Sequence, residues 1–284
     1  MKAVAQTRHG IDIALVPKAD MRACEQITRE VFQFRDIDVM PGWVMYTASQ
    51  HGGLALGAYV EGGLVGYSFA LPGYADGRAF LYSIGLLVRS GFEDRNVGTM
   101  LKLAQGEHAQ RLGYDLVKWS VDPLASRPMY LYLSRLGARL VAYLPEIYEL
   151  FALGGLDAAI VADEAEIEWE LGEPDARPAS GPRCRSADVA DRLVTESRGH
   201  VQGGRELHGW REPQGTGPHF VELPWDLQEL KRVSIELATG WRMGVRATMT
   251  DLLERGFVGT SVLLDTEASR SFVRFDRPGG EARG

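Results

Sequence analysis

A strand, a short turn and a helix follow one another between Leu81 and Leu112, and this unit constrains the fold more than any other stretch. Residues 81–88 form an apolar run of strand length. From Val97 onward, apolar side chains recur at steps of three and four, which is typical of a helix. The first turn of a helix has backbone N–H groups without intrahelical partners, and its dipole favours negative charge. A strand that enters a helix through a basic turn therefore predicts an anion site.

Two residues of this turn suit a phosphate. Gly98 permits a ligand to approach the backbone closely, and Arg95 offers a fork of N–H donors. Gly113 follows the helix, where a glycine with positive φ often ends the last turn. The sequence therefore predicts a phosphate site at the start of the helix.

Length and charge narrow the classes of protein to which the chain can belong. Its 284 residues are 45% hydrophobic, which is enough for a large core and for more than one domain. A net charge of −7 argues against a broad nucleic-acid surface, which needs clustered Lys and Arg. Cys24 and Cys184 are the only cysteines. Two cysteines are too few for a disulfide framework, and their spacing does not match a zinc site.

The N-terminal sequence lacks the apolar core of a signal peptide, and no apolar run approaches membrane-spanning length. We therefore predict a cytoplasmic protein with no membrane or nucleic-acid partner and no metal.

The hydrophobic pattern predicts strands and helices in a mixed order along the first 171 residues. These elements are a strand at 11–16, helices at 18–34 and 42–50, strands at 54–60, 64–71 and 81–88, a helix from 97 to 112, a strand at 116–121, a helix at 126–136, and strands at 138–143 and 166–171.

This order, with particular segments, resembles the GNAT acyltransferase fold, and more closely a long bacterial branch of GNAT enzymes. The segments that carry the resemblance are GGLVGYSFALPG, LYSIGLLV, RNVGTMLK, AQRLGYDLVKWSVDPL, LSRLGA and EIEWEL, and, in the tail, residues 223–224, 241–246 and 255–257. The resemblance covers most of the chain. Some members of this branch are associated with N-succinylation of amino acids.

The resemblance implies an α/β (α+β) fold: a mixed central sheet with flanking helices and a splayed strand pair. We expect a GNAT acyl-CoA-binding domain at residues 1–172 and a linker at 173–186, which is rich in Pro and Gly. A smaller α/β extension at 187–284 is expected to pack on the core and to shape the acceptor pocket or a homodimer contact.

In GNAT folds the pantetheine arm of acyl-CoA pairs with the central strand, and its pyrophosphate rests on the N–H groups of the turn that follows. The strand at 116–121 is expected to splay away and to open a slot for the thioester and the amine. By resemblance, the acyl-CoA-binding residues here are Leu86, Leu87, Val88, Arg95, Asn96, Val97, Gly98 and Thr99.

The turn departs from the usual GNAT pattern. If Gly98 is the second glycine of the motif, then Glu93 replaces the leading basic residue and Asn96 replaces the first glycine. If the motif instead starts at Arg95, Met100 stands where Gly or Ala belongs. We prefer the first register, because Leu101 then falls at the helix position that the family buries. Asn tolerates a left-handed conformation better than most residues, so the turn can form without the glycine.

A second departure affects the proton donor. The branch has Asn-Ala where this chain has Pro128-Met129, and the usual general-acid Tyr position holds Leu133. Tyr132 is our candidate for the acid that protonates the thiolate, and the alternative is a tyrosine that only packs.

Few residues qualify as the base. Asp122 ends the strand beside the slot, and Ser83 lies on the central strand, so both are catalytic candidates. Tyr82, next to Ser83, is a candidate substrate contact. Asp before Pro is also an ordinary turn former, which is the alternative for Asp122.

The tail offers an arginine pair. Arg242 and Arg246 lie one turn apart in a predicted helix that Ser234 can cap, after a shorter helix that Asp226 can cap. The two arginines could clamp a carboxylate-bearing acyl group or substrate. A solvated or interdomain pair is the alternative.

The sequence thus predicts an N-acyltransferase that moves an acetyl or succinyl-type group from acyl-CoA to the amine of a small, amino-acid-like molecule. Two alternatives remain. The chain could bind acyl-CoA as a regulatory module, or it could catalyse atypical chemistry on a GNAT scaffold.

Overall fold

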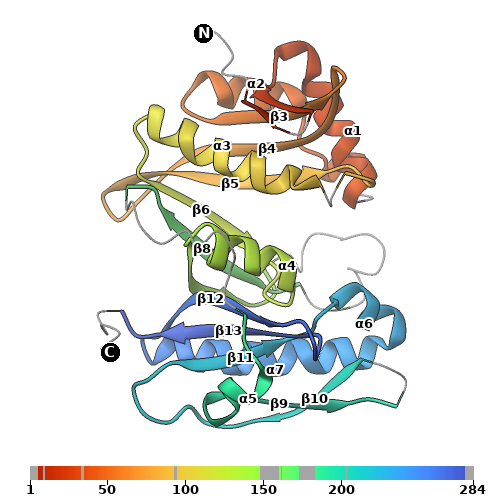
Figure 1. Ribbon diagram of the computed structural model, residues 1–284. Helices are drawn as coiled ribbons and strands as arrows, with labels where there is room; N and C mark the ends of the chain where they lie inside the picture. Colours follow the sequence, from red (N-terminus) through yellow and green to blue (C-terminus); the bar gives the residue numbers. More distant parts are fainter. Residues whose placement is uncertain are drawn as a thin grey trace. The chain divides into compact units, whose positions relative to one another are not determined.

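The computed structural model describes residues 6–8, 10–32, 35–92, 95–147, 160, 162–172, 183–201 and 204–278. The chain forms two compact units (Figure 1). Unit 1 comprises Met1–Trp119 and Glu170–Glu173, and unit 2 comprises Ser120–Trp169 and Pro174–Gly284. The predicted domain boundaries at 172 and 187 stay a prediction, and most of the predicted linker lies outside the described residues.

Unit 1 contains a sheet with the strand order β1-β2-β3-β4-β5-β6, in which the β5–β6 pair is parallel and the other pairs are antiparallel. Its elements are β1 (Gln6–Arg8), β2 (Ile11–Leu15), α1 (Met21–Phe32), α2 (Gly42–Gln50), β3 (Leu54–Val60), β4 (Gly63–Ala75), β5 (Arg78–Val88), α3 (Val97–Arg111) and β6 (Leu116–Val121), with single 3₁₀ turns at Lys18–Asp20 and Asp36–Asp38.

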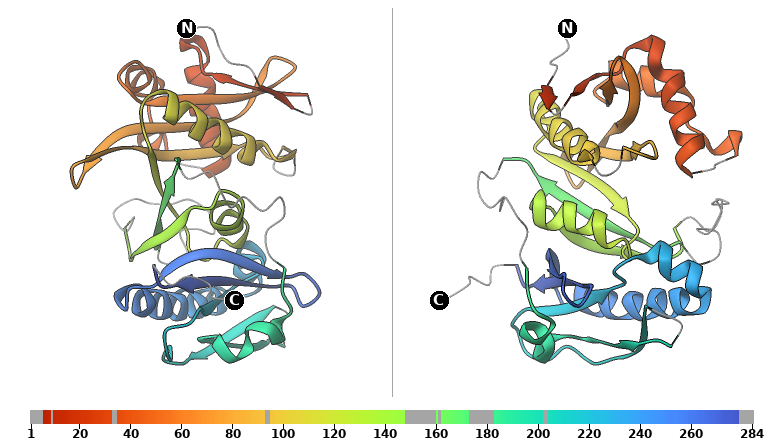
Figure 2. Two further views of the ribbon diagram at one scale, coloured as in Figure 1. Left: turned by 60° about the vertical axis from the view of Figure 1, so that its left-hand side comes forward. Right: turned by 45° about the vertical axis from the view of Figure 1, so that its right-hand side comes forward.

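Helices cover both faces of this sheet. Cys24 and Ile27 of α1, Met45 of α2, and Phe69 and Leu87 of the sheet share one apolar cluster. Helix α3 packs on β3, β4 and β5, and Figure 2 shows it on the opposite side of these strands from α1 and α2. The predicted strand–turn–helix unit is therefore confirmed, with its helix packed on one face of the sheet of unit 1.

Strand β5 has two irregularities that matter for a ligand. Opposite β4, Phe69 pairs with Gly85 and Ala70 pairs with Ser83, so Ile84 is an extra residue and forms a β-bulge. On its other side, β5 pairs with β6 at Leu81 and Tyr82 only. The predicted splayed strand pair is confirmed, because the described pairing stops there although β5 continues to Val88.

Unit 2 contains a sheet with the order β8-β7-β12-β13-β11 and a separate β9–β10 hairpin. Its elements are α4 (Ser126–Met129), a π-helical turn (Tyr130–Arg135), β7 (Arg139–Leu144), β8 (Glu164–Glu170), α5 (Ser186–Val189), a 3₁₀ turn (Ala190–Arg192), β9 (Thr195–Gly199), β10 (Arg205–Trp210), β11 (His219–Leu223), α6 (Leu227–Val233), α7 (Ile235–Glu254), β12 (Val258–Asp265) and β13 (Arg270–Asp276).

Helix α7 forms where its sequence pattern predicts it. The Ser234 side chain accepts a hydrogen bond from the Leu237 N–H at 3.2 Å and caps the helix, as Asp226 caps α6. Trp241 and Val245 on its inner face are fully buried. Among the described residues, no helix combines the length and the apolar character needed to cross a bilayer.

Candidate functional site

The turn between β5 and α3 has the geometry of an anion cradle. Asn96 precedes the helix with φ 59° and ψ 18°, a left-handed conformation, and its C=O accepts the Met100 N–H at 3.0 Å. No side chain among the described residues caps α3 at this position. The first-turn N–H groups of Val97, Gly98 and Thr99 are those that a helix leaves without intrahelical acceptors. Gly98 and Thr99 are partly exposed, whereas Val97 is fully buried.

Gly98 keeps the space above these groups open. A Cβ atom at this position would have a single neighbour within 4 Å, Leu86 Cδ2 at 3.8 Å. Arg95 is exposed in the same turn, with its guanidinium 5.0 Å from the centre of the Phe92 ring. Arg89 instead makes an ion pair with Glu30. Glu93, the departure noted in the sequence, lies outside the described residues, and so does Asp94. The described residues of the turn fit a diphosphate.

Upstream of the cradle, β5 presents a backbone edge. Leu86, Leu87 and Val88 pair with β4 on one side, whereas the described pairing with β6 ended at Tyr82. An extended ligand arm can add to such an edge through backbone hydrogen bonds. The half-buried Tyr82 lies where the two strands begin to separate.

A buried polar cluster lies beneath this edge, and the sequence did not predict it. Lys102 of α3 donates from Nζ to Ser83 Oγ and to Gln105 Oε1, each at 3.0 Å, and Nζ is 3.7 Å from the centre of the Trp119 ring. The Lys102 side chain is only 1% exposed, and burial lowers its pKa well below the ordinary value. A lysine in a helix that covers a sheet is normally expected to point into solvent, so nothing in the sequence predicts that Lys102 is buried.

In unit 2, Asp122 and Arg242 form a bidentate ion pair. The two guanidinium nitrogens donate to the two carboxylate oxygens at 2.7 and 2.8 Å. Asp122 also accepts the Leu124 N–H at 2.8 Å, so it forms the turn that the sequence offered as its alternative role.

Arg246 is held in the same way, one helical turn further along α7. Its guanidinium donates to both oxygens of Asp163, at 2.7 and 2.9 Å, and to Glu146 at 2.7 Å. Tyr143 donates to Asp163 at 2.7 Å, and burial together with this carboxylate raises the pKa of Tyr143. Both arginines of the predicted clamp therefore already bind carboxylates, which an acidic ligand would have to displace.

Glu164 lies within this charged group and was also missed by the sequence reasoning. Burial raises the pKa of its carboxyl to about 8; Asp122 adds to the effect, and a hydrogen bond from Ser120 opposes it. Tyr132 is buried, and burial and Glu164 together raise the pKa of its hydroxyl. A carboxyl that titrates near neutral pH can exchange protons, which makes Glu164 an acid–base candidate.

The structure thus places the predicted residues in two groups. Unit 1 holds Ser83, Tyr82 and the whole predicted acyl-CoA set. Unit 2 holds Asp122, Tyr132, Arg242 and Arg246, with Glu164 and Asp163 among them. The roles assigned to these residues stay predictions.

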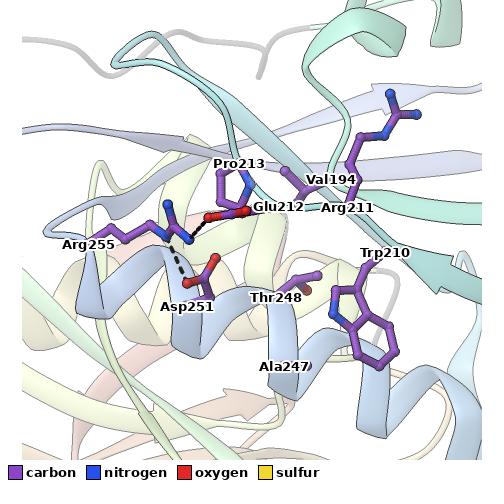
Figure 3. A pocket seen from close by; sticks show the side chains of 9 residues that line it. All are labelled: Val194, Trp210, Arg211, Glu212, Pro213, Ala247, Thr248, Asp251 and Arg255. Carbon is purple, nitrogen blue, oxygen red and sulfur yellow. Dashed lines mark hydrogen bonds and ion pairs between the residues drawn. The ribbon is translucent and has the colours of Figure 1, made fainter.

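A hollow of about 290 Å³ lies elsewhere in unit 2 (Figure 3). It is lined by Val194, Trp210, Arg211, Glu212, Pro213, Ala247, Thr248, Asp251 and Arg255. Arg255 spans it and pairs with Asp251 at 2.8 Å and with Glu212 at 2.6 Å. None of the predicted site residues line it. Within the described ranges, no three His, Cys, Asp or Glu side chains are grouped to hold a metal ion.

No protein-family model matches the sequence, and no curated protein is similar to it. Solved structures are similar to part of the chain. The YncA protein of Salmonella typhimurium with its cofactor acetyl-CoA is 18% identical, over 61% of this chain and 100% of that one, with a TM-score of 0.46.

The ribosomal-protein-S18-alanine N-acetyltransferase of Escherichia coli is 12% identical, over 60% of this chain and 99% of that one, with a TM-score of 0.45. An aminoglycoside 6'-acetyltransferase of type Ii is 17% identical, over 57% of this chain and 99% of that one, with a TM-score of 0.45. These likenesses concern structure, and the function proposed below depends on the geometry of unit 1.

Proposed function

We propose that this chain is an acyltransferase that binds acyl-CoA on unit 1 and passes the acyl group to an amine. The observation that supports it best is the continuity of two features. The open edge of β5 at Leu86–Val88 is followed, after residues 89–95, by the left-handed Asn96 and by a first turn of α3 that no described side chain caps. An extended arm followed by a diphosphate has this same order of chemical groups.

The donor is proposed to carry an acetyl or succinyl-type group, and the acceptor to be a small, amino-acid-like molecule. In direct transfer, a base or a water chain removes a proton from the ammonium, and the amine nitrogen attacks the thioester carbonyl. A backbone N–H polarises that carbonyl, the C–S bond breaks, and an acid protonates the thiolate. Most of the rate gain comes from positioning, so a weak acid need not abolish turnover.

Asp122 and Ser83 stay our proposed catalytic residues on the amine side, Tyr132 the proposed acid that protonates the thiolate, and Tyr82, Arg242 and Arg246 the proposed substrate contacts. Asp122, Tyr132, Arg242 and Arg246 already interact with other groups of unit 2, which limits what they can do without rearrangement. Burial and Glu164 raise the pKa of the Tyr132 hydroxyl, so this tyrosine releases its proton less readily than an exposed one.

A second candidate is a protein that binds acyl-CoA without turnover, or that catalyses atypical chemistry. Asn96, Pro128 and Leu133 favour it, because each stands where the GNAT pattern has a different residue.

Titration calorimetry with CoA, acetyl-CoA and succinyl-CoA tests the binding part of the proposal. We expect all three to bind, and no binding of any of them would overturn it. Release of free CoA thiol from acetyl-CoA and succinyl-CoA with a panel of amines and amino acids tests turnover. Binding without amine-stimulated release would favour the second candidate.

A further inference from the structure

Lys102 occupies the point where the two central strands of unit 1 separate. The last described pair of β5 with β6 joins Tyr82 and Lys118, so Ser83 and Trp119 are the first residues beyond the pairing. Lys102 Nζ contacts both of them, at 3.0 Å from Ser83 Oγ and 3.7 Å from the Trp119 ring centre. A basic nitrogen is therefore held next to a hydroxyl at the base of the splay.

Packing alone does not account for a lysine here. Moving an ammonium group out of water is expensive, and an apolar side chain such as Met would fill similar space without that cost. Burial lowers the pKa of Lys102 and so favours the neutral amine, which has a lone pair that an ammonium group lacks. Such a lone pair can accept the proton of the Ser83 hydroxyl across the same 3.0 Å.

Two further groups suit Lys102 to move that proton. Gln105 Oε1 accepts one N–H of Lys102 at 3.0 Å, which fixes the orientation of Nζ. The face of the Trp119 ring stabilises an ammonium when the proton arrives. A nucleophile within hydrogen-bond reach of a base, with the base oriented by a third group, is the arrangement that activates serine in covalent catalysis.

Ser83 is 6% exposed and lies on the strand whose open edge is proposed to hold the pantetheine arm. The next residue, Ile84, is the bulged residue of β5 and is 45% exposed, although it is a large apolar side chain on a central strand. The open edge proposed to hold the pantetheine arm begins three residues after Ser83. The serine is thus on the same strand as that edge, with its side chain turned to Lys102 of α3.

We propose that Ser83, activated by Lys102, is a nucleophile that accepts the acyl group of acyl-CoA, which gives the chain a second activity as an acyl-CoA hydrolase. This inference rests on the proposed function in one point only, the binding of acyl-CoA on unit 1.

The reaction has two steps. In the first, Ser83 Oγ forms a bond to the thioester carbonyl carbon, the C–S bond breaks, and the hydroxyl proton passes through Lys102 Nζ to the sulfur to give free CoA thiol. In the second, water attacks the acyl-serine ester and Lys102 takes its proton. The ester C–O bond breaks, Ser83 regains the proton, and a carboxylic acid leaves.

The test measures CoA thiol release from acetyl-CoA with no amine present, in the full chain and in S83A and K102M. We expect each variant to lose at least about a hundredfold of the amine-independent rate, the usual size of a general-base contribution. S49A and K18M, which change a partly exposed serine of α2 and an exposed lysine, both in unit 1 and outside the β5–α3 turn, are matched controls and should keep the rate.

Peptide mass mapping after rapid quenching of the reaction with acetyl-CoA locates the covalently bound acyl group, which we expect on Ser83. Calorimetric affinity for CoA and circular dichroism show whether S83A and K102M remain folded. An unchanged rate in folded S83A, or an acyl label on another residue, overturns this inference and leaves acyl-CoA binding intact. Failure of the wild-type chain to bind CoA would instead overturn the proposed function.

Discussion

Arg242 and Asp122 bind one another through two parallel hydrogen bonds, yet they differ sharply in access to water. The Arg242 side chain is 2% exposed, whereas that of Asp122 is 31% exposed. The arginine therefore depends on the carboxylate to compensate its buried charge, and the carboxylate depends far less on the arginine. Arg242 Nε, moreover, has no hydrogen-bond partner among the described residues.

This asymmetry predicts unequal effects of removing either partner. D122N leaves a buried guanidinium without its counter-charge, and we expect it to lower the free energy of unfolding by about 3–5 kcal/mol. R242M should cost less, because the remaining carboxylate can hydrate and Met fills much of the vacated volume. Urea unfolding of both variants measures the difference. An R242M cost equal to or above that of D122N would contradict the prediction.

Glu164 predicts a pH dependence of stability with a definite sign. Its carboxyl has a pKa of about 8 in the folded chain against 4.5 ordinarily, so between these values the folded state holds a proton that the unfolded state has lost. Stability then falls as the pH rises through this window. E164Q removes this cost, and we expect it to gain about 5 kcal/mol over wild type above pH 8 but little below pH 4.5.

Urea unfolding near pH 5 and near pH 8.5 measures this effect, with E61Q, a change at an exposed loop carboxylate, as the control. The control should shift equally at both pH values. A difference between E164Q and wild type that does not grow with pH would show that Glu164 is charged in the folded state throughout.

The left-handed conformation of Asn96 predicts which substitutions the turn between β5 and α3 tolerates. Its φ of 59° costs most L-residues about 1–2 kcal/mol, and Gly adopts it without strain. N96G should therefore retain wild-type stability and CoA affinity, whereas N96V should lower the free energy of unfolding by about 1–2 kcal/mol and weaken CoA binding. Thermal unfolding and calorimetry measure both. Equal behaviour of N96G and N96V would mean that the conformation at this position is unimportant.

The local pattern of apolar and polar residues in the sequence was sufficient to predict much of the fold. The apolar run at 81–88, the turn and the spacing within α3 each depend on neighbours in the sequence, and all three are present in the structure. The caps at Asp226 and Ser234 were predictable for the same reason, since a cap needs only the residues of one helical turn.

The polar clusters were not predictable, because they depend on residues far apart in the chain. Nothing near Lys102 in sequence indicates that Trp119 and Ser83 enclose it. Arg242 and Arg246 were correctly placed one turn apart. Their carboxylate partners, however, come from 120 and 83 residues away, and those partners decide whether the arginines are available to a ligand.

Gly98 gives the most direct check of the proposed cradle. A Cβ there meets Leu86 Cδ2 at an ordinary 3.8 Å, so the fold accepts a side chain at this position while a diphosphate would not. We expect G98W to weaken CoA binding at least tenfold, about 1.4 kcal/mol, with thermal stability unchanged. G98A, the matched small substitution, should lose less affinity and gain helix stability, since Gly is the poorer helix former. Calorimetric titration of CoA into all three proteins separates the outcomes. If G98W binds CoA as tightly as wild type, the diphosphate does not rest on the first turn of α3, and the acyl-CoA site must be sought elsewhere in the chain.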